Sequence, residues 1–194
     1  MMPASLRPWY LPLGLSLLVT LLALGGSELA TQLRFDRAAL GQGQWWRLFS
    51  AHLVHLGGSH TALNVAGLAL IWGLVGGAFD ERQWLGIMAG LMLGISLGLW
   101  LFNPQLGWYV GLSGVLHGML AAGALAQLRR GERQAMVLLL LVGAKLVWEQ
   151  LSGPLPGSEA TAGGAVIVDA HLYGGIIGLL PGALLRPATP ASAT

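Results

Sequence analysis

The stretch that decides the fold is QWLGIMAGLMLGISLGLWLFNPQLGWYVGLSGVLHGMLAAGALAQ, residues 83–127, which contains no Asp, Glu, Lys or Arg. A single helix needs about 20 predominantly apolar residues to cross the hydrocarbon core of a bilayer, so this length fits two crossings. The natural break is Asn103-Pro104. The stretch therefore predicts one membrane helix over residues 84–102 and another over residues 111–128.

The composition of the whole chain agrees with a bilayer environment. Charged residues make up 9% of the 194 residues and hydrophobic residues 55%, whereas a soluble domain carries about a quarter charged residues. The net charge of +2 does not suggest a nucleic-acid-binding surface. Because the chain has no cysteine, disulfides, a thiolate nucleophile and a cysteine-based metal site are excluded.

Four further apolar runs are long enough to span a membrane. They cover residues 9–27, 60–79, 134–151 and 168–185. The first run could instead be a secretory signal peptide, but no clear small-x-small cleavage site closes it. The sequence thus predicts an all-α membrane protein, a bundle of six transmembrane helices in a single domain over residues 1–186. A disordered tail is expected over residues 187–194.

The arginines predict the orientation. With the N-terminus and the C-terminus in the cytoplasm, six arginines are cytoplasmic and three lie outside, as the positive-inside tendency requires. The cytoplasmic ones are Arg7, Arg82, Arg129, Arg130, Arg133 and Arg186, and the outer ones are Arg34, Arg37 and Arg47. The Gly/Pro/Ser-rich connection 152–164 then lies outside, where it could cap an entrance.

Polar residues gather where the second, fourth and sixth predicted helices begin. His60 and Asn64 open the second helix, Ser113 opens the fourth, and Asp169 and His171 open the sixth. Under this topology all three helices begin on the outer side. Their polar residues are therefore expected at one shallow depth below the outer surface.

Ser113 and His171 are candidates for a nucleophile and its general base. A glycine-framed serine is weak evidence alone, because small residues also pack membrane helices together. However, each residue is followed by a pair of glycines four residues apart, and such faces would let the two helices approach closely. The pairs are Gly114 with Gly118 and Gly174 with Gly178.

His60 and Asn64 share one helix face and could donate hydrogen bonds to an oxyanion. The backbone N–H of Ser113 could add a third donor, with Gly111 giving the preceding loop its freedom. A structural cap at a helix start is the alternative. A zinc site is also conceivable, with His55, His60, His117 and His171 as its ligands. No recognisable ligand spacing supports such a site, so neither a metal nor a cofactor is expected.

Lys145 and Glu149 are the charged residues of the predicted fifth helix, near its outer end. Their spacing of four residues allows them to pair on one helix face. Intramembrane charges are often functional, so a role for Glu149 remains an alternative. Mutual pairing is the simpler interpretation.

At these positions the chain resembles the rhomboid intramembrane serine proteases. The matching residues, in family order, are Trp46-Arg47, His55, His60-x-x-x-Asn64, Gly111-x-Ser113-Gly114 and Ala170-His171-x-x-Gly174-x-x-x-Gly178. The resemblance implies a catalytic dyad of Ser113 and His171 without a carboxylate, and oxyanion stabilisation by His60 and Asn64. Asp169 is not expected to complete a triad, since its position turns it away from the His171 face.

His117 departs from the pattern of many rhomboids, which carry an aromatic residue four positions after the serine. With this histidine and its short six-helix form, the chain is similar to the bacterial rhombosortase branch. His117 is expected to stack on His171 or to tune it. That resemblance implies a site opening to the periplasmic side of the inner membrane. It also implies contact with membrane lipids and membrane-anchored substrates that end in Gly-Gly, a transmembrane segment and a basic tail. Transfer of the cleaved product to an amine is a possible second step.

Other functions remain open. A general rhomboid protease would act on other single-span membrane proteins. A non-catalytic rhomboid-like protein would bind membrane clients, but it predicts loss of the serine or the histidine, and both are present. A small transporter would need charges along a path or helices broken at the midplane.

Overall fold

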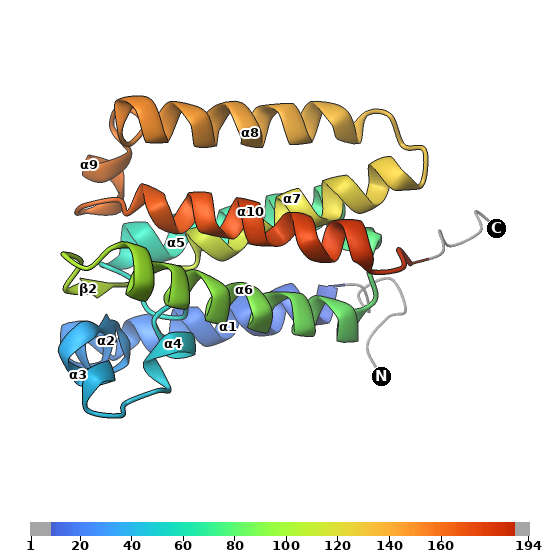
Figure 1. Cartoon of the computed structure of the whole chain (residues 1–194). Helices are drawn as coiled ribbons and strands as arrows, with labels where there is room; N and C mark the ends of the chain where they lie inside the picture. The colour runs from blue at the N-terminus through green and yellow to red at the C-terminus, as the bar shows by residue number, and fades with distance from the viewer. Residues whose placement is uncertain (1–8, 189–194) are drawn as a thin grey trace, which may run out of the picture.

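Long helices lie side by side in the computed structural model, which describes residues 9–188 (Figure 1). Arg7 and residues 189–194 of the expected tail lie outside the described residues. The long helices begin and end within a few residues of the predicted ranges. They are α1 (Tyr10–Leu24), α5 (Gly58–Val75), α6 (Glu81–Phe102), α7 (Ser113–Arg129), α8 (Ala135–Ser152) and α10 (Val168–Leu184).

Short elements occupy the connections at one end of the bundle (Figure 1). The first connection holds α2 (Gly26–Leu33), β1 (Phe35–Asp36), α3 (Arg37–Gly41) and α4 (Arg47–Ser50). β1 pairs antiparallel with β2 (Trp108–Tyr109), and α9 (Ser158–Ala162) lies inside the Gly/Pro/Ser-rich connection 152–164. The exception is η2 (Gly76–Ala78), which joins α5 to α6 at the other end of the bundle (Figure 1). α2 is bent by 116° from α1, at Gly26, whose φ of 65° favours glycine.

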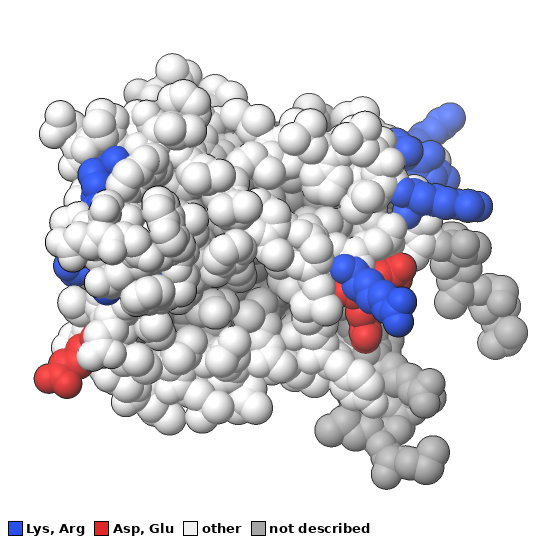
Figure 2. Space-filling model, turned by 60° about the horizontal axis from the view of Figure 1, so that its bottom comes forward, with Lys and Arg blue, Asp and Glu red and all other residues white. Residues whose placement is uncertain are grey.

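Three helical segments are long and apolar enough to cross a membrane: Gly58–Ala78, Glu81–Phe102 and Ala135–Ser152. The bent pair α1 and α2 would make a fourth if it is one span, and α10 is a shorter apolar helix. The predicted number of six crossings is therefore not confirmed by length and composition. Figure 2 shows lysine and arginine side chains at the two ends of the molecule, with an uncharged surface between them.

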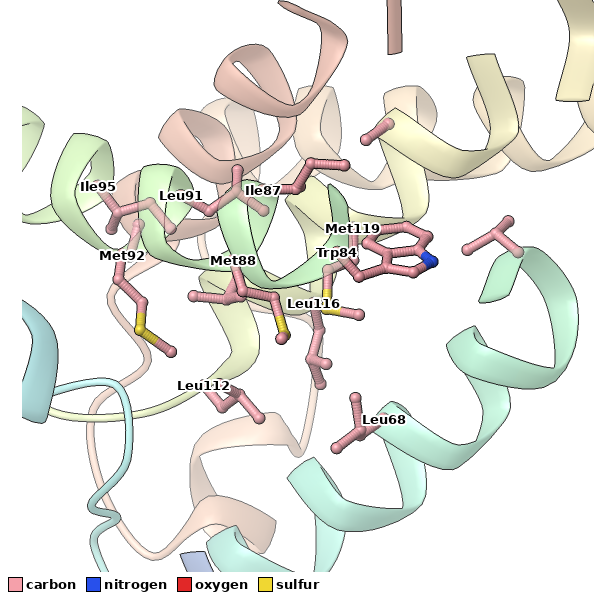
Figure 3. Close-up of a cluster of buried hydrophobic side chains, with 14 of the residues drawn as sticks. Leu68, Trp84, Ile87, Met88, Leu91, Met92, Ile95, Leu112, Leu116 and Met119 are labelled. Carbon is pink, nitrogen blue, oxygen red and sulfur yellow. The ribbon is translucent and has the colours of Figure 1, made fainter. Parts of the chain in front are cut away.

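The core forms where α6 packs against α5 and α7 (Figure 3). α6 starts with a capping box, in which Asp80 accepts from the Gln83 amide and the Gln83 side chain accepts from the Asp80 amide. The buried face of α6 then repeats every three or four residues, as expected for an amphipathic helix. The side chains that meet are Trp84, Ile87, Met88, Leu91, Met92 and Ile95 of α6, Leu112, Leu116 and Met119 beside or on α7, and Leu68 of α5.

α7 and α10 are in backbone contact along their glycine faces. A Cβ atom on Gly174 would overlap the carbonyl oxygen of Gly114, and one on Gly178 would overlap the carbonyl oxygen of Gly118. Only glycine permits so close an approach. The first turns of the two helices, which carry Ser113 and His171, are held together in this way.

Arg37 fixes the first connection to the end of α6. Its guanidinium donates to four carbonyl oxygens, at distances of 2.8–3.0 Å. Helix ends leave carbonyls without intrahelical partners, and this cation donates to carbonyls at the end of α6 and just beyond it. The acceptors are the carbonyls of Leu99, Trp100, Asn103 and Leu106.

Candidate active site

Ser113 and His171 meet at the end of the α7–α10 contact where both helices begin. Ser113 is the first residue of α7, and its Oγ lies 2.9 Å from Nε2 of His171. His171 is in the first turns of α10 and is 5% exposed. The distance is that of a nucleophile hydrogen-bonded to its base.

Glu149 provides the second partner of His171, and this corrects the interpretation of Glu149 drawn from the sequence. The expected pair is present, with Lys145 Nζ 2.6 Å from Glu149 Oε1. The other carboxylate oxygen, Oε2, lies 2.9 Å from Nδ1 of His171. An ionised carboxylate only accepts hydrogen bonds, so Nδ1 carries the proton and Nε2 presents a lone pair to the Ser113 hydroxyl.

His117 stacks on His171. The ring centroids are 4.3 Å apart and the ring planes differ by 20°. The Nδ1 atom of His117 lies 2.7 Å from the backbone oxygen of Ser113, which is an acceptor only, so this nitrogen donates. His117 therefore contacts the backbone of the serine and the face of the base rather than the serine hydroxyl.

His60 and Asn64 of α5 line the same cavity as Ser113. The backbone amide of Leu56 donates to His60 Nδ1 at 3.3 Å, which leaves the Nε2–H of the neutral ring free to donate. Asn64 Nδ2 donates to the backbone oxygen of His60 at 2.9 Å, and an amide nitrogen carries a second hydrogen. Both residues can thus donate to an oxyanion.

Gly111 allows the loop before α7 to approach His60. Its φ is 124°, and an added Cβ would lie 3.0 Å from His60 Cε1. Its own amide donates to the carbonyl oxygen of Ala51 at 3.0 Å, so this N–H is already used. The backbone donor nearest the nucleophile is that of Ser113, which belongs to the helix-start amides without an intrahelical acceptor.

A cavity of about 300 Å³ opens on these groups. Its walls come from α5, α7, α8 and the segment that contains α9. Leu155, Ser158 and Ala162 of that segment line it directly. The connection that the sequence suggested as a cap therefore forms one wall of the cavity.

Asp169 faces away from the dyad, toward α6. Its carboxylate accepts from Asn103 Nδ2 at 2.5 Å, and Asn103 Oδ1 accepts from the Tyr173 hydroxyl at 2.7 Å. This set of bonds ties the start of α10 to the end of α6.

A second serine–histidine contact joins Ser96 and His52, which sequence reasoning did not single out. His52 Nε2 lies 3.0 Å from both Ser96 Oγ and the Met92 carbonyl. The Ser96 hydroxyl donates to the Leu48 carbonyl at 2.7 Å. The histidine nitrogen is thus the donor in this pair, and both residues are fully buried, which is a structural arrangement rather than a nucleophile with its base.

Burial keeps the two histidines of the first connection neutral. It lowers the pKa of His52 to about 4 and, together with the neighbouring His60, lowers the pKa of His55 to about 3. Desolvation disfavours the imidazolium form. Neither ring nitrogen of His55 has a hydrogen-bond partner among the described residues.

One cluster at the site has the side-chain types that could hold a metal ion. Across residues 9–188, the one group whose ligand atoms lie within 4.8 Å of one another is His117, Glu149 and His171. All three already hydrogen-bond to protein groups. The four histidines considered from the sequence do not form such a group.

Residues 42–188 match the family model described as Rhomboid domain. The chain belongs to the rhomboid family. Rhomboids are generally serine intramembrane proteases, and the family together with the apolar helices makes this chain a multi-pass membrane protein with a protease-like function. A comparison with curated proteins gives no match.

Proposed function

We propose that this rhomboid is a serine endopeptidase that cleaves peptide bonds within the outer leaflet of its membrane. The observation that carries the proposal is the 2.9 Å contact between Ser113 Oγ and His171 Nε2 at a cavity. The hydrogen bond to Glu149 leaves Nε2 with the lone pair that a general base needs. Ser113 is the nucleophile and His171 the base.

In the acylation step, the Ser113 oxygen attacks the scissile carbonyl carbon while His171 Nε2 takes the hydroxyl proton. The carbonyl oxygen becomes an oxyanion, which accepts from His60 Nε2–H, the Asn64 amide and the Ser113 backbone N–H. The peptide C–N bond then breaks. His171 returns its proton to the leaving amine, and the acyl group stays on Ser113.

In the deacylation step, His171 Nε2 takes a proton from water while the water oxygen attacks the ester carbonyl carbon. The bond between this carbon and the Ser113 oxygen then breaks, and His171 returns its proton to the Ser113 oxygen, which restores the hydroxyl. Leu155, Ser158 and Ala162 form one wall of the cavity. We expect it to move when substrate or water enters, as lids over enzyme sites do.

The proposed topology has six crossings, with both termini in the cytoplasm and the site facing the periplasm of a bacterial inner membrane. α7 and α10, with 17 residues each, reach the short limit for a membrane helix. The inferred arginine distribution supports this orientation. Ser113 and His171 are then both near the outer surface.

The proposed substrates are exported proteins with a C-terminal Gly-Gly, a transmembrane segment and a basic tail, as in the rhombosortase branch. His117 at the fourth position after the serine supports this branch. A Gly-Gly pair also weakens a helix, and an unwound segment exposes the extended backbone that a protease needs. The product could be released by water or transferred to an amine.

A serine-reactive fluorophosphonate probe tests the activity. We expect the purified protein to be labelled and the Ser113→Ala variant to remain unlabelled. A wild-type protein that never labels would refute the enzymatic proposal and favour a client-binding role.

Co-expression with a Gly-Gly-tailed substrate, followed by mass spectrometry of the new C-terminus, tests the substrate proposal. A free carboxylate after the cleavage site indicates hydrolysis, and an added amine-bearing group indicates transfer. If the probe labels Ser113 but the tailed substrate stays intact, the enzyme is a rhomboid protease with other single-span substrates.

A further inference from the structure

We propose that Glu149 is a positioning residue for His171, so that the site works as a Ser113–His171–Glu149 triad held in place by Lys145. This inference rests on the proposed protease function. It differs from the carboxylate-free dyad that the family resemblance implies. The carboxylate comes from α8, a helix that contributes neither the nucleophile nor the base.

Each oxygen of the Glu149 carboxylate has its own partner. Oε2 lies 2.9 Å from His171 Nδ1, and Oε1 lies 2.6 Å from Lys145 Nζ. The Glu149 side chain is 2% exposed and that of His171 is 7% exposed. A buried hydrogen bond between these groups fixes both the ring orientation and the proton position of the imidazole.

Lys145 accounts for a carboxylate at this depth. An isolated buried charge is costly, and a partner with complementary charge offsets much of that cost. Lys145 precedes Glu149 by one helical turn on the same helix face, and its side chain is 30% exposed. The lysine thus offsets part of the cost of burying the carboxylate, while Oε2 remains available to His171.

In the reaction, the carboxylate stabilises the charge that forms on the base. When His171 Nε2 takes the Ser113 proton, the ring becomes an imidazolium between an oxyanion site and the Glu149 carboxylate. The Nδ1 proton stays on the ring, so no second proton transfer is needed. The other titratable groups that face His171 are His117 from α7, Lys145 from α8 and His60 from α5.

The rival interpretation is that Lys145 and Glu149 are simply a structural ion pair. In that case, removal of either charge should have the same effect, because each variant breaks the same pair. A positioning role instead predicts unequal effects. Loss of Glu149 removes the partner of His171, whereas loss of Lys145 leaves that partner present.

The test measures the rate of fluorophosphonate labelling as a function of pH in detergent micelles. We expect Glu149→Gln to label roughly 10²–10⁴-fold more slowly than wild type, by analogy with amide replacement of a triad carboxylate. The acidic limb of its pH profile should move to lower pH, because the protonated base has lost an adjacent anion. Lys145→Met should lose less than about tenfold, since Glu149 can still accept from His171.

Glu28→Gln is the matched control. Glu28 is in the first turn of α2, near the same end of the bundle (Figure 1). Its side chain is exposed and does not line the cavity. This variant removes the same charge without touching His171, so it should label at the wild-type rate with the wild-type pH profile.

Glu149→Gln leaves the Lys145 cation without its partner, which could destabilise the fold by itself. The double variant, Lys145→Met with Glu149→Gln, controls for this effect. It removes both charges together and should show the same slow labelling, with thermal unfolding near that of wild type. Equal rates and pH profiles for wild type and Glu149→Gln, or equal losses for Glu149→Gln and Lys145→Met, would overturn the positioning role while leaving the protease proposal intact. A wild-type protein that does not label would overturn both.

Discussion

Gly114 is the residue at which packing and reactivity are most directly linked, and Gly114→Ala tests that link. Gly114 follows the nucleophile in α7, and the facing residue, Ala170, precedes the base in α10. An added Cβ would lie 2.7 Å from the carbonyl oxygen of Ala170 and 3.1 Å from its carbonyl carbon. The clash is with backbone, so no side-chain rotation can relieve it.

The size of the effect follows from these distances. Ordinary contacts begin at 3.4 Å, so the two backbones must separate by about 0.7 Å, and a strain of this kind costs about 1–3 kcal/mol of stability. The same separation would lengthen the 2.9 Å contact between Ser113 and His171 to about 3.6 Å, beyond hydrogen-bond range. We expect the labelling rate to fall about 10–100-fold, given that a misplacement of about 1 Å costs roughly 100-fold.

The assay is fluorophosphonate labelling combined with thermal unfolding in detergent. Gly143→Ala on α8 is the matched control, because nothing lies within 4 Å of the added Cβ and alanine is a better helix former. It should label like wild type and unfold at the same temperature or above it. A Gly114→Ala variant that labels at the wild-type rate would show that close helix contact does not set the geometry of the site.

Three further outcomes are expected. His117→Phe should retain measurable proteolysis because a phenyl ring can stack on the base as His117 does, whereas His171→Ala should abolish it; equal loss in both variants would refute the assignment. The free energy of unfolding, measured as a function of pH, should fall below pH 6.5. Burial lowers the pKa of His52 to about 4 in the fold, so folded His52 stays neutral in this range, whereas His52 of the unfolded chain binds a proton. His52 should account for about 3 kcal/mol of the loss near pH 4, and the loss should be smaller in His52→Gln. Arg37→Met should lower the free energy of unfolding by about 2–4 kcal/mol, measured by thermal unfolding, since its four carbonyl bonds vanish; an unchanged unfolding temperature would contradict this.

The positions of the long helices could be predicted because apolar runs and their polar ends are local properties of the chain. The uncharged stretch 83–127 corresponds to α6 and the greater part of α7, and Asn103 ends α6. The short elements were not predictable in the same way. α9 has five residues, and the bend between α1 and α2 depends on one glycine, Gly26, among the 30 glycines of the chain.

The proximity of Ser113 and His171 could also be inferred, because their glycine spacing encodes a close helix contact. Nothing in the spacing of His52 relative to Ser96 marks their hydrogen bond, since they come from the first connection and from the middle of α6. Such a pair becomes visible only when the helices are packed.

The contact between Glu149 and His171 follows from the same rule of depth that brings the other polar residues together. Those other polar residues lie at the beginnings of the second, fourth and sixth predicted helices. The first, third and fifth predicted helices run the opposite way, so their C-terminal ends reach the same level as those beginnings. The fifth predicted helix is α8. Glu149 lies three residues before the end of α8, at the depth of Ser113 and His171, and a carboxylate there can meet the base directly. Intramembrane charges near the ends of antiparallel helices should therefore be compared with the starts of their neighbours before they are assigned to pairs within one helix.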